Sequence, residues 1–170
     1  MLQDVFKFMR GKLIVIDGSD ASGKHTQSEL LKKKLNEAGC EVRLLDFPQY
    51  GSFFGKMVKL YLNGEFGDLN SVDPKLISLM YALDRFSQKE KIKKWLDLGY
   101  WVVLDRYVES NMAYQSAKLA KDSEKIEFLS WLDKLEYEEL GVPKADVVFY
   151  LHVSEYQSRY LLPKFLLQKY

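Results

Sequence analysis

The stretch KLIVIDGSDASGKHT, residues 12–26, decides how this chain is organised. Its first part is an apolar run that is typical of a strand buried on both faces. Its second part matches the pattern G-x-x-x-x-G-K from Gly18 to Lys24, in which glycines permit a turn that aims backbone N–H groups at a phosphate. After Lys24 the apolar spacing becomes helical, and the N-terminal end of a helix favours anions. The stretch therefore predicts a strand, a phosphate-binding loop and a helix. The alternative is a plain glycine turn.

One position departs from the phosphate-loop pattern. The residue after Lys24 is ordinarily Ser or Thr, whose hydroxyl binds Mg²⁺, but here it is His25, and Thr26 comes one place late. Imidazole is a poorer ligand for Mg²⁺ than oxygen. Either Mg²⁺ is held by water, nucleotide phosphates and a carboxylate, which we favour, or phosphoryl transfer is impaired. The expected ATP-phosphate contacts are Gly18, Ser22, Gly23, Lys24, His25 and Thr26.

Strands and helices are expected to alternate along the rest of the chain. The strands are predicted at 12–17, 41–46, 100–105 and 146–151, and the helices at 24–38, 54–62, 74–97, 110–120 and 123–140. This order indicates an α/β fold, a three-layer sandwich of a parallel sheet with helices on both faces. Ligands bind beyond the carboxyl ends of such strands, so the segments that follow the first three strands are expected to meet at one edge.

Composition limits the classes of function. The chain has 170 residues, which predicts a single domain over 1–170, and 25 Lys and Arg against 24 Asp and Glu, a net charge of +1. Such a balance disfavours binding to nucleic acid. Cys40 is the only cysteine, which excludes a disulfide framework within the chain. We expect no membrane span, no secretory signal and a cytoplasmic location.

Five segments, in this order along the chain, resemble the thymidylate kinase family of P-loop nucleoside monophosphate kinases. They are GSDASGKHTQ (18–27), DFPQYGSFFGKMVKLYLNGEFG (46–67), LISLMYALDR (76–85), DRYVESNMAYQSAK (105–118) and WLDKLEYEELGVPKADVVFYLHV (131–153). The first segment alone indicates only a P-loop, whereas the ordered set is specific. The resemblance implies an enzyme of nucleotide biosynthesis that transfers the γ-phosphoryl group of ATP to dTMP, giving dTDP and ADP, with Mg²⁺ as cofactor.

Two other functions are alternatives to this kinase activity. One is a nucleotide-binding module with impaired or no turnover, which His25 and the short C-terminal region motivate. The other is a kinase for another nucleoside monophosphate.

Asp105 and Arg106 end a predicted strand as a charge pair, which is unusual for a buried strand. The resemblance implies that Asp105 holds Mg²⁺, directly or through water, and that Arg106 grips the acceptor phosphate with its planar fork. With Lys24 these are the expected catalytic residues; a strand-end salt bridge without a ligand is the alternative. Asp20, inside the loop, is implied to bind the 3′-hydroxyl of the monophosphate sugar, and a local turn hydrogen bond is its alternative.

The resemblance also implies a site for dTMP. Tyr81 would stack on thymine and Arg85 would bond to its O4, and their spacing places them on one helix face. Their alternative is an exposed surface pair, because a stripe of Leu76, Leu79, Met80, Leu83 and Phe86 is expected to supply the core. Asn111 would read the pyrimidine edge, with a helix N-terminal cap as its alternative, and Tyr114 would crowd C2′ of the sugar. The full expected set is Asp20, Phe47, Tyr50, Tyr81, Arg85, Arg106, Ser110, Asn111, Tyr114 and Gln115.

Tyr50 has two interpretations, a hydrogen bond to the acceptor phosphate or packing under its loop. The family has an Arg-rich lid, a fifth strand and a final helix after the fourth strand. Here residues 154–170 are expected to form only a partial lid, with Arg159 as its candidate, and the fifth strand and final helix are expected to be absent. A homodimer through the helices at 54–62 and 74–97 is expected, with ATP and dTMP as the other partners.

Overall fold

The computed structural model describes residues 10–154. The chain divides into two compact units. Of the described residues, the first unit contains 10–45, Leu96–Arg106 and 145–154, and the second contains Asp46–Trp95 and Tyr107–Lys144. The predicted tail at 155–170, and with it the lid candidate Arg159, lies outside the described residues. Among the helices of residues 10–154, none is both long enough and apolar enough to span a membrane.

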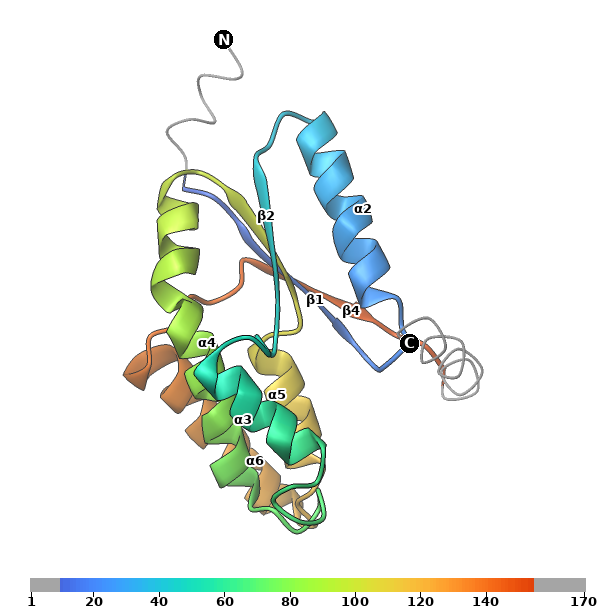
Figure 1. Ribbon diagram of the computed structural model, residues 1–170, viewed down its shortest axis with the longest axis vertical. Coiled ribbons are helices and arrows are strands. Elements are labelled where there is room, and N and C mark those ends of the chain that lie inside the picture. Colours follow the sequence, from blue (N-terminus) through green and yellow to red (C-terminus); the bar gives the residue numbers. More distant parts are fainter. Residues whose placement is uncertain (1–9, 155–170) are drawn as a thin grey trace. The chain divides into compact units, whose positions relative to one another are not determined.

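The first unit is built on a parallel sheet. Its strands are β1 (Leu13–Gly18), β2 (Val42–Asp46), β3 (Trp101–Asp105) and β4 (Val147–Leu151), in the order β2-β3-β1-β4. Every residue of β1 is buried, which explains its uninterrupted apolar run. Helix α2 (Lys24–Glu37) lies along this sheet (Figure 1), and its Leu31 and Leu35 pack against a core that includes Ile14 and Val103. The predicted α/β fold with a parallel sheet is confirmed.

Asp146 joins the start of β4 to β1. Its carboxylate accepts hydrogen bonds from Leu13 N at 2.8 Å and Lys12 Nζ at 3.0 Å, and its own backbone N donates to Leu13 O at 2.8 Å. Partial burial opposes the charge of Asp146, but the Leu13 N–H and Lys12 outweigh this effect and lower its pKa. The hydrogen bonds of Asp146 to Leu13 therefore fix how β4 aligns with β1.

The second unit is helical. It holds α3 (Phe53–Leu62), most of α4 (Pro74–Asp97), α5 (Val108–Ser116), α6 (Asp122–Asp133) and the π-helix η1 (Lys134–Glu139), which follows α6 directly. Asp73 accepts hydrogen bonds from Lys75 N and Leu76 N at 2.8 and 3.0 Å, so it caps α4 as its Asp-Pro start predicts. Helices α3 and α4 pack together through a buried apolar cluster of Tyr61, Val72 and Ile77.

The predicted core stripe of α4 is wrong for three of its five residues, whereas Met80 packs against the buried cluster of Tyr61, Val72 and Ile77 and Leu83 is half-buried. Leu76, Leu79 and Phe86 are 52%, 37% and 40% exposed, whereas Ile77 is fully buried and Arg85 is 2% exposed. The helix buries a face that contains charged side chains, and an analysis of apolar spacing counts such side chains against burial. The prediction therefore placed Leu76, Leu79 and Phe86 on the buried face of the helix wrongly.

Two helix boundaries also differ from their predictions. The helix expected at 110–120 is α5, which begins and ends earlier, at Val108 and Ser116. The helix expected at 123–140 is α-helical only from Asp122 to Asp133 and continues as the π-helix η1. The wider π-turn is confirmed by Leu140 N, which donates to Leu135 O at 2.9 Å. The side chains of η1 therefore point in directions that an α-helical spacing does not predict.

Replacing Asp146 by Ala should lower the free energy of unfolding by about 1–2 kcal/mol near neutral pH, because two hydrogen bonds to its carboxylate are lost. The lowered pKa gives the sign of the pH dependence: the stabilisation is present above the ordinary value of 3.8 and is lost as the pH falls through the folded-state pKa. Urea unfolding should show the two proteins converging in acid. A difference that stayed constant down to low pH would contradict the role of the carboxylate, and Glu65→Ala, at an exposed position, is the control.

Candidate functional site

The loop Gly18–Lys24 follows β1 and leads into α2. Gly18 has a φ of +148°, and a Cβ atom there would lie 2.5 Å from Leu151 O of the neighbouring strand β4. Gly23 precedes α2 with a φ of +86°, in the left-handed region that favours glycine. Both glycines of the motif are therefore needed for the path of the backbone. The first turn of α2 contains no acidic residue, which suits an anion at its N-terminus.

Lys24 lies over the loop rather than in solvent. Its Nζ donates to Gly18 O at 3.0 Å and to Ser19 O at 2.7 Å, and the residue is 8% exposed. Burial lowers the pKa of Lys24, and Arg106 acts in the same direction, while Asp105 is the first of the carboxylates that oppose the shift. His25 and Thr26 follow in the first turn of α2 and are exposed.

Arg106 begins the turn after β3 and contacts the loop. Its Nη2 donates to Asp20 Oδ1, and its Nη1 lies 4.0 Å from Asp17 Oδ1. Arg106 has a φ of +67°, a left-handed conformation that is uncommon for a residue with a Cβ. Asp17 is 5% exposed and also accepts the backbone N–H of Gly18 at 2.7 Å. The loop and the end of β3 thus present two cations, Lys24 and Arg106, at one edge of the sheet.

The residues near the loop suit a metal ion that takes most of its ligands from nucleotide and water. No group of three His, Cys, Asp or Glu side chains within residues 10–154 could hold a metal by itself. Asp105 lies opposite Ile16 at the end of β3, and it acts electrostatically on Lys24. The Oγ atoms of Ser19 and Ser22 are buried and have no hydrogen-bond partner among the described residues. One carboxylate and nearby hydroxyls fit Mg²⁺, which usually keeps several waters.

The segment after β2 belongs to the second unit, and Asp84 of α4 holds it. The Asp84 carboxylate accepts Gln49 N at 2.7 Å and Ser52 Oγ at 2.6 Å, and Asp84 is 1% exposed. Phe47, a predicted dTMP contact, is 5% exposed, and its ring centroid lies 5.9 Å from that of Tyr107. Tyr50 is 45% exposed.

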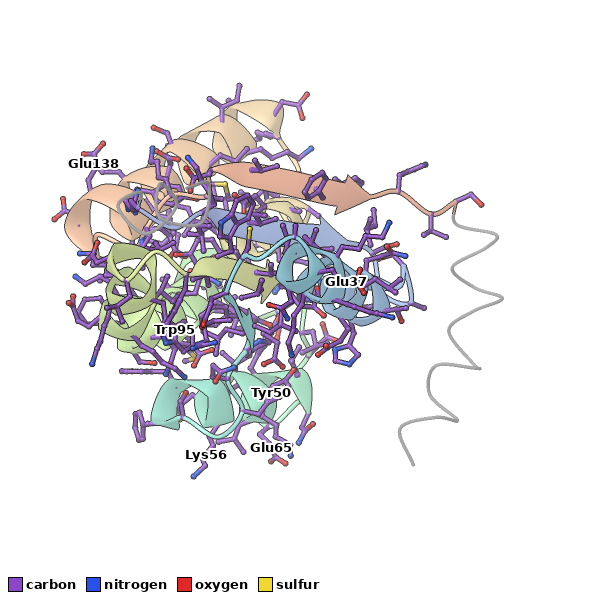
Figure 2. All side chains as sticks on the ribbon, turned by 90° about the horizontal axis from the view of Figure 1, so that it is seen from above. Glu37, Tyr50, Lys56, Glu65, Trp95 and Glu138 are labelled. Carbon is purple, nitrogen blue, oxygen red and sulfur yellow. The ribbon has the colours of Figure 1, made fainter. Side chains whose placement is uncertain are left out.

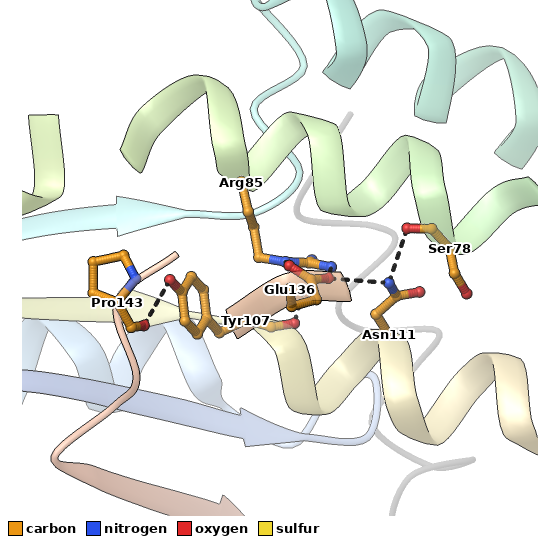
Figure 3. A network of polar contacts seen from close by, with 6 residues as sticks. All are labelled: Ser78, Arg85, Tyr107, Asn111, Glu136 and Pro143. Carbon is orange, nitrogen blue, oxygen red and sulfur yellow. Dashed lines mark hydrogen bonds and ion pairs between the residues drawn. The ribbon is translucent and has the colours of Figure 1, made fainter. Parts of the chain in front are cut away.

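Arg85 takes part in a buried ion pair. Its Nε donates to Glu136 Oε2 at 3.1 Å and its Nη2 to Glu136 Oε1, while its Nη1 lies 3.5 Å from Tyr107 O (Figure 3). Burial opposes the charge of Arg85, but the attraction and hydrogen bonds of Glu136 outweigh it and raise its pKa. The alternative of an exposed surface pair is therefore wrong for Arg85. Tyr81, one helical turn earlier, is half-buried and packs against the cluster that contains Tyr61.

Asn111 lies inside α5 and is 3% exposed, so the alternative of a helix cap is wrong. Its Nδ2 donates to Ser78 O at 3.1 Å and to Glu136 Oε1 at 3.5 Å. Its Oδ1 and the Oε1 of Gln115, one turn further along α5, are buried and have no hydrogen-bond partner among the described residues. Ser110 is half-buried and Tyr114 is 48% exposed.

The predicted site residues thus fall into two groups, one in each unit. The ATP-phosphate loop, Asp20, Asp105 and Arg106 lie in the first unit, and the other predicted dTMP contacts lie in the second. Sequence reasoning missed Asp17, Asp84 and Glu136. A signal was available for the first two: Asp17 ends the apolar run of the predicted strand at 12–17, and Asp84 directly follows the apolar residues 79–83 of the predicted helix.

Known thymidylate kinases resemble this chain over most of its length. The family model described as Thymidylate kinase matches residues 16–158. The thymidylate kinase of Plasmodium falciparum (isolate 3D7) is 38% identical over 144 residues, which are 85% of this chain and 62% of that protein. The human thymidylate kinase is 35% identical over 145 residues, again 85% of this chain and 62% of that protein.

A solved thymidylate kinase structure from Candida albicans superposes with a TM-score of 0.71 at 29% identity, and covers 88% of this chain and 66% of that one. The chain therefore spans less than two thirds of the length of the relatives it matches. Because the family model covers most of the sequence, and relatives above 30% identity align with most of it, this chain belongs to the thymidylate kinase family.

Proposed function

We propose that this protein transfers the γ-phosphoryl group of ATP to dTMP, giving dTDP and ADP. The observation that carries the proposal is the pairing of Lys24 with Arg106 at the carboxyl edge of the sheet, where carbonyl groups and carboxylates of the loop hold both cations. Phosphoryl transfer needs little covalent chemistry from the protein and depends on positioning and on neutralising the phosphate oxygens. Membership of the thymidylate kinase family supports dTMP as the acceptor.

In the proposed step, an oxygen of the dTMP 5′-phosphate attacks the γ-phosphorus of ATP. The bond from that phosphorus to the bridging oxygen breaks, and ADP leaves with its electron pair. Lys24 turns from Gly18 O and Ser19 O towards the phosphates of ATP, and Arg106 binds the acceptor phosphate with its fork. Asp20, which contacts Arg106, binds the 3′-hydroxyl beside it.

Mg²⁺ is the proposed cofactor, with Asp105 as its protein ligand, directly or through water. The ion would neutralise charge on the phosphate oxygens when bound. This chain itself would contribute two cations, Lys24 and Arg106, and one carboxylate, Asp105. None of these three roles depends on His25, which is exposed.

The base site is proposed in the second unit. Thymine carries an acceptor at O4 and an N–H at N3, and a charged guanidinium and an amide oxygen complement these two groups. Arg85 and Asn111 supply that pair, and both are bonded to Glu136 Oε1. Tyr81 would cover the ring of the base and Tyr114 its sugar, with Phe47, Tyr50, Ser110 and Gln115 completing the site.

A homodimer and a cytoplasmic location complete the proposal. Large apolar side chains of α3 and α4 are exposed, among them Phe53 at 73% and Leu76 at 52%. A second copy of this chain would remove them from water. Analytical ultracentrifugation should give the mass of two chains, and a monomer at every concentration would contradict the dimer.

ADP formation measured by a coupled assay, with ATP–Mg²⁺ and a panel of nucleoside monophosphates, tests the activity. We expect dTMP to be the best acceptor, and Lys24→Ala to abolish turnover while the protein stays folded, since no other loop cation replaces the lysine. Lys34→Ala, at an exposed position in the last turn of α2, is the control. Nucleotide binding without ADP formation, or faster turnover of another monophosphate, would contradict the proposal.

Arg106→Ala should raise the barrier by about 2–4 kcal/mol, the value of lost charge-assisted contacts to the acceptor phosphate. The measurement is kcat/KM for dTMP at saturating ATP, alongside urea unfolding. Arg10→Ala removes an exposed arginine of the same unit and should change neither quantity. If Arg106→Ala lowered stability alone and left kcat/KM intact, the residue would be a structural partner of Asp17 and Asp20.

A further inference from the structure

Glu136 is a buried carboxylate of the second unit that accepts hydrogen bonds from two predicted site residues. It is fully buried, with 0% exposure, and it lies on the π-helix η1, where the wider turn departs from α-helical spacing. Its two oxygens receive hydrogen bonds from residues of two other helices, Arg85 of α4 and Asn111 of α5 (Figure 3). A buried carboxylate that bridges two helices is costly unless its bonds are well formed.

Glu136 determines the orientation of the Arg85 guanidinium. The guanidinium has five N–H groups in a rigid fork. Glu136 engages the Nε side and one Nη2 hydrogen, and Tyr107 O lies 3.5 Å from Nη1. Because two N–H groups on one edge are bonded to Glu136, the planar guanidinium cannot rotate. The N–H groups on its other edge therefore point in a defined direction.

The same carboxylate determines the orientation of the Asn111 amide. An amide can present either its oxygen or its NH₂ to a ligand. Asn111 Nδ2 points at two acceptors, Ser78 O and Glu136 Oε1, so Oδ1 must point the other way. That oxygen is buried and has no hydrogen-bond partner among residues 10–154. Since Arg85 Nη2 and Asn111 Nδ2 both donate to Glu136 Oε1, the guanidinium and the amide are neighbours that share one acceptor.

We propose that Glu136 is a positioning residue that determines base specificity, because it presents Arg85 as a donor and Asn111 as an acceptor. The inference rests on the proposed function, in which these two residues face the base. Thymine matches this order with its O4 acceptor and its N3–H donor. Cytosine has the reverse order, an exocyclic amine donor and a ring-nitrogen acceptor, so it meets donor against donor and acceptor against acceptor. Such a mismatch leaves buried polar groups unpaired, which is a strong source of discrimination.

Glu136→Gln tests this proposal, because it keeps the size of the side chain and replaces one acceptor oxygen by an NH₂ group. Since that group cannot accept a hydrogen bond, either Arg85 or Asn111 loses its acceptor, and the side chain that loses it is no longer held in one orientation. Calorimetry on the whole chain should show dTMP binding weakened by about 10- to 100-fold, the value of one charge-assisted hydrogen bond. The dTMP-to-dCMP affinity ratio should fall by a similar factor, while the affinity for ATP stays unchanged.

Glu138→Gln is the matched control, since Glu138 lies on the same π-helix and its side chain points away from the protein at the surface (Figure 2). It should leave both affinities as in the wild type. Should Glu136→Gln fail to fold, Glu136→Asp keeps the charge but withdraws it by one methylene, and its dTMP-to-dCMP ratio should also fall.

An unchanged ratio in a folded Glu136 variant would overturn the specificity role and leave the proposed function standing. Equal weakening of dTMP and dCMP would also overturn it, because a purely structural carboxylate predicts that result. A wild-type chain that does not bind dTMP in preference to dCMP would instead overturn the proposed function, and with it this inference.

Discussion

The ion pair between Arg85 and Glu136 is the interaction on which the second unit most depends. Both side chains are almost fully removed from water, and taking two charges out of water costs several kcal/mol per ion before any attraction is counted. The bonds to Tyr107 and Asn111 help to offset that cost and tie α4, α5 and η1 together. An apolar pair of similar volume often gives equal or greater stability, so stability alone is a weak reason for this arrangement. Holding hydrogen-bonding groups in fixed directions is a better one.

The first unit follows the same physical logic at its phosphate loop. Arg106 is bonded to carboxylates of the protein, so this cation has a defined position before any anion binds, whereas Lys24 is bonded to loop carbonyl groups from which it would turn to reach the phosphates. Groups that are already oriented need little reorganisation when charge develops on a substrate, which is the main source of electrostatic catalysis. The cost is local strain, shown by the left-handed backbone of Arg106. In each unit, a carboxylate positions an arginine.

The parts of the candidate site that could be predicted from sequence are local ones. The loop from Gly18 to Lys24 is a short contiguous motif, and its glycines adopt the conformations that its pattern requires. Asp105 and Arg106 are recognisable because charges end an apolar strand. Asp84 and Glu136 were missed because each acts on residues at least 25 positions away, and nothing in their own neighbourhood reports that contact. The exposed apolar residues of α4 were assigned to the core because the charged residues that are buried instead, Asp84 and Arg85, find their partners only in the tertiary structure.

The amino-acid sequence by itself determined the α/β class, the order of the strands and helices along the chain and the position of the phosphate loop. These features depend on periodicity, on glycine conformation and on helix capping, all of which act over a few residues. Only the tertiary structure decided which face of α4 is buried, that the helix after Asp133 widens into a π-turn, and that Arg85 and Asn111 share one carboxylate oxygen. The physical reason is that a buried charge is tolerated only where a partner from elsewhere in the chain meets it, and local spacing contains no record of that partner.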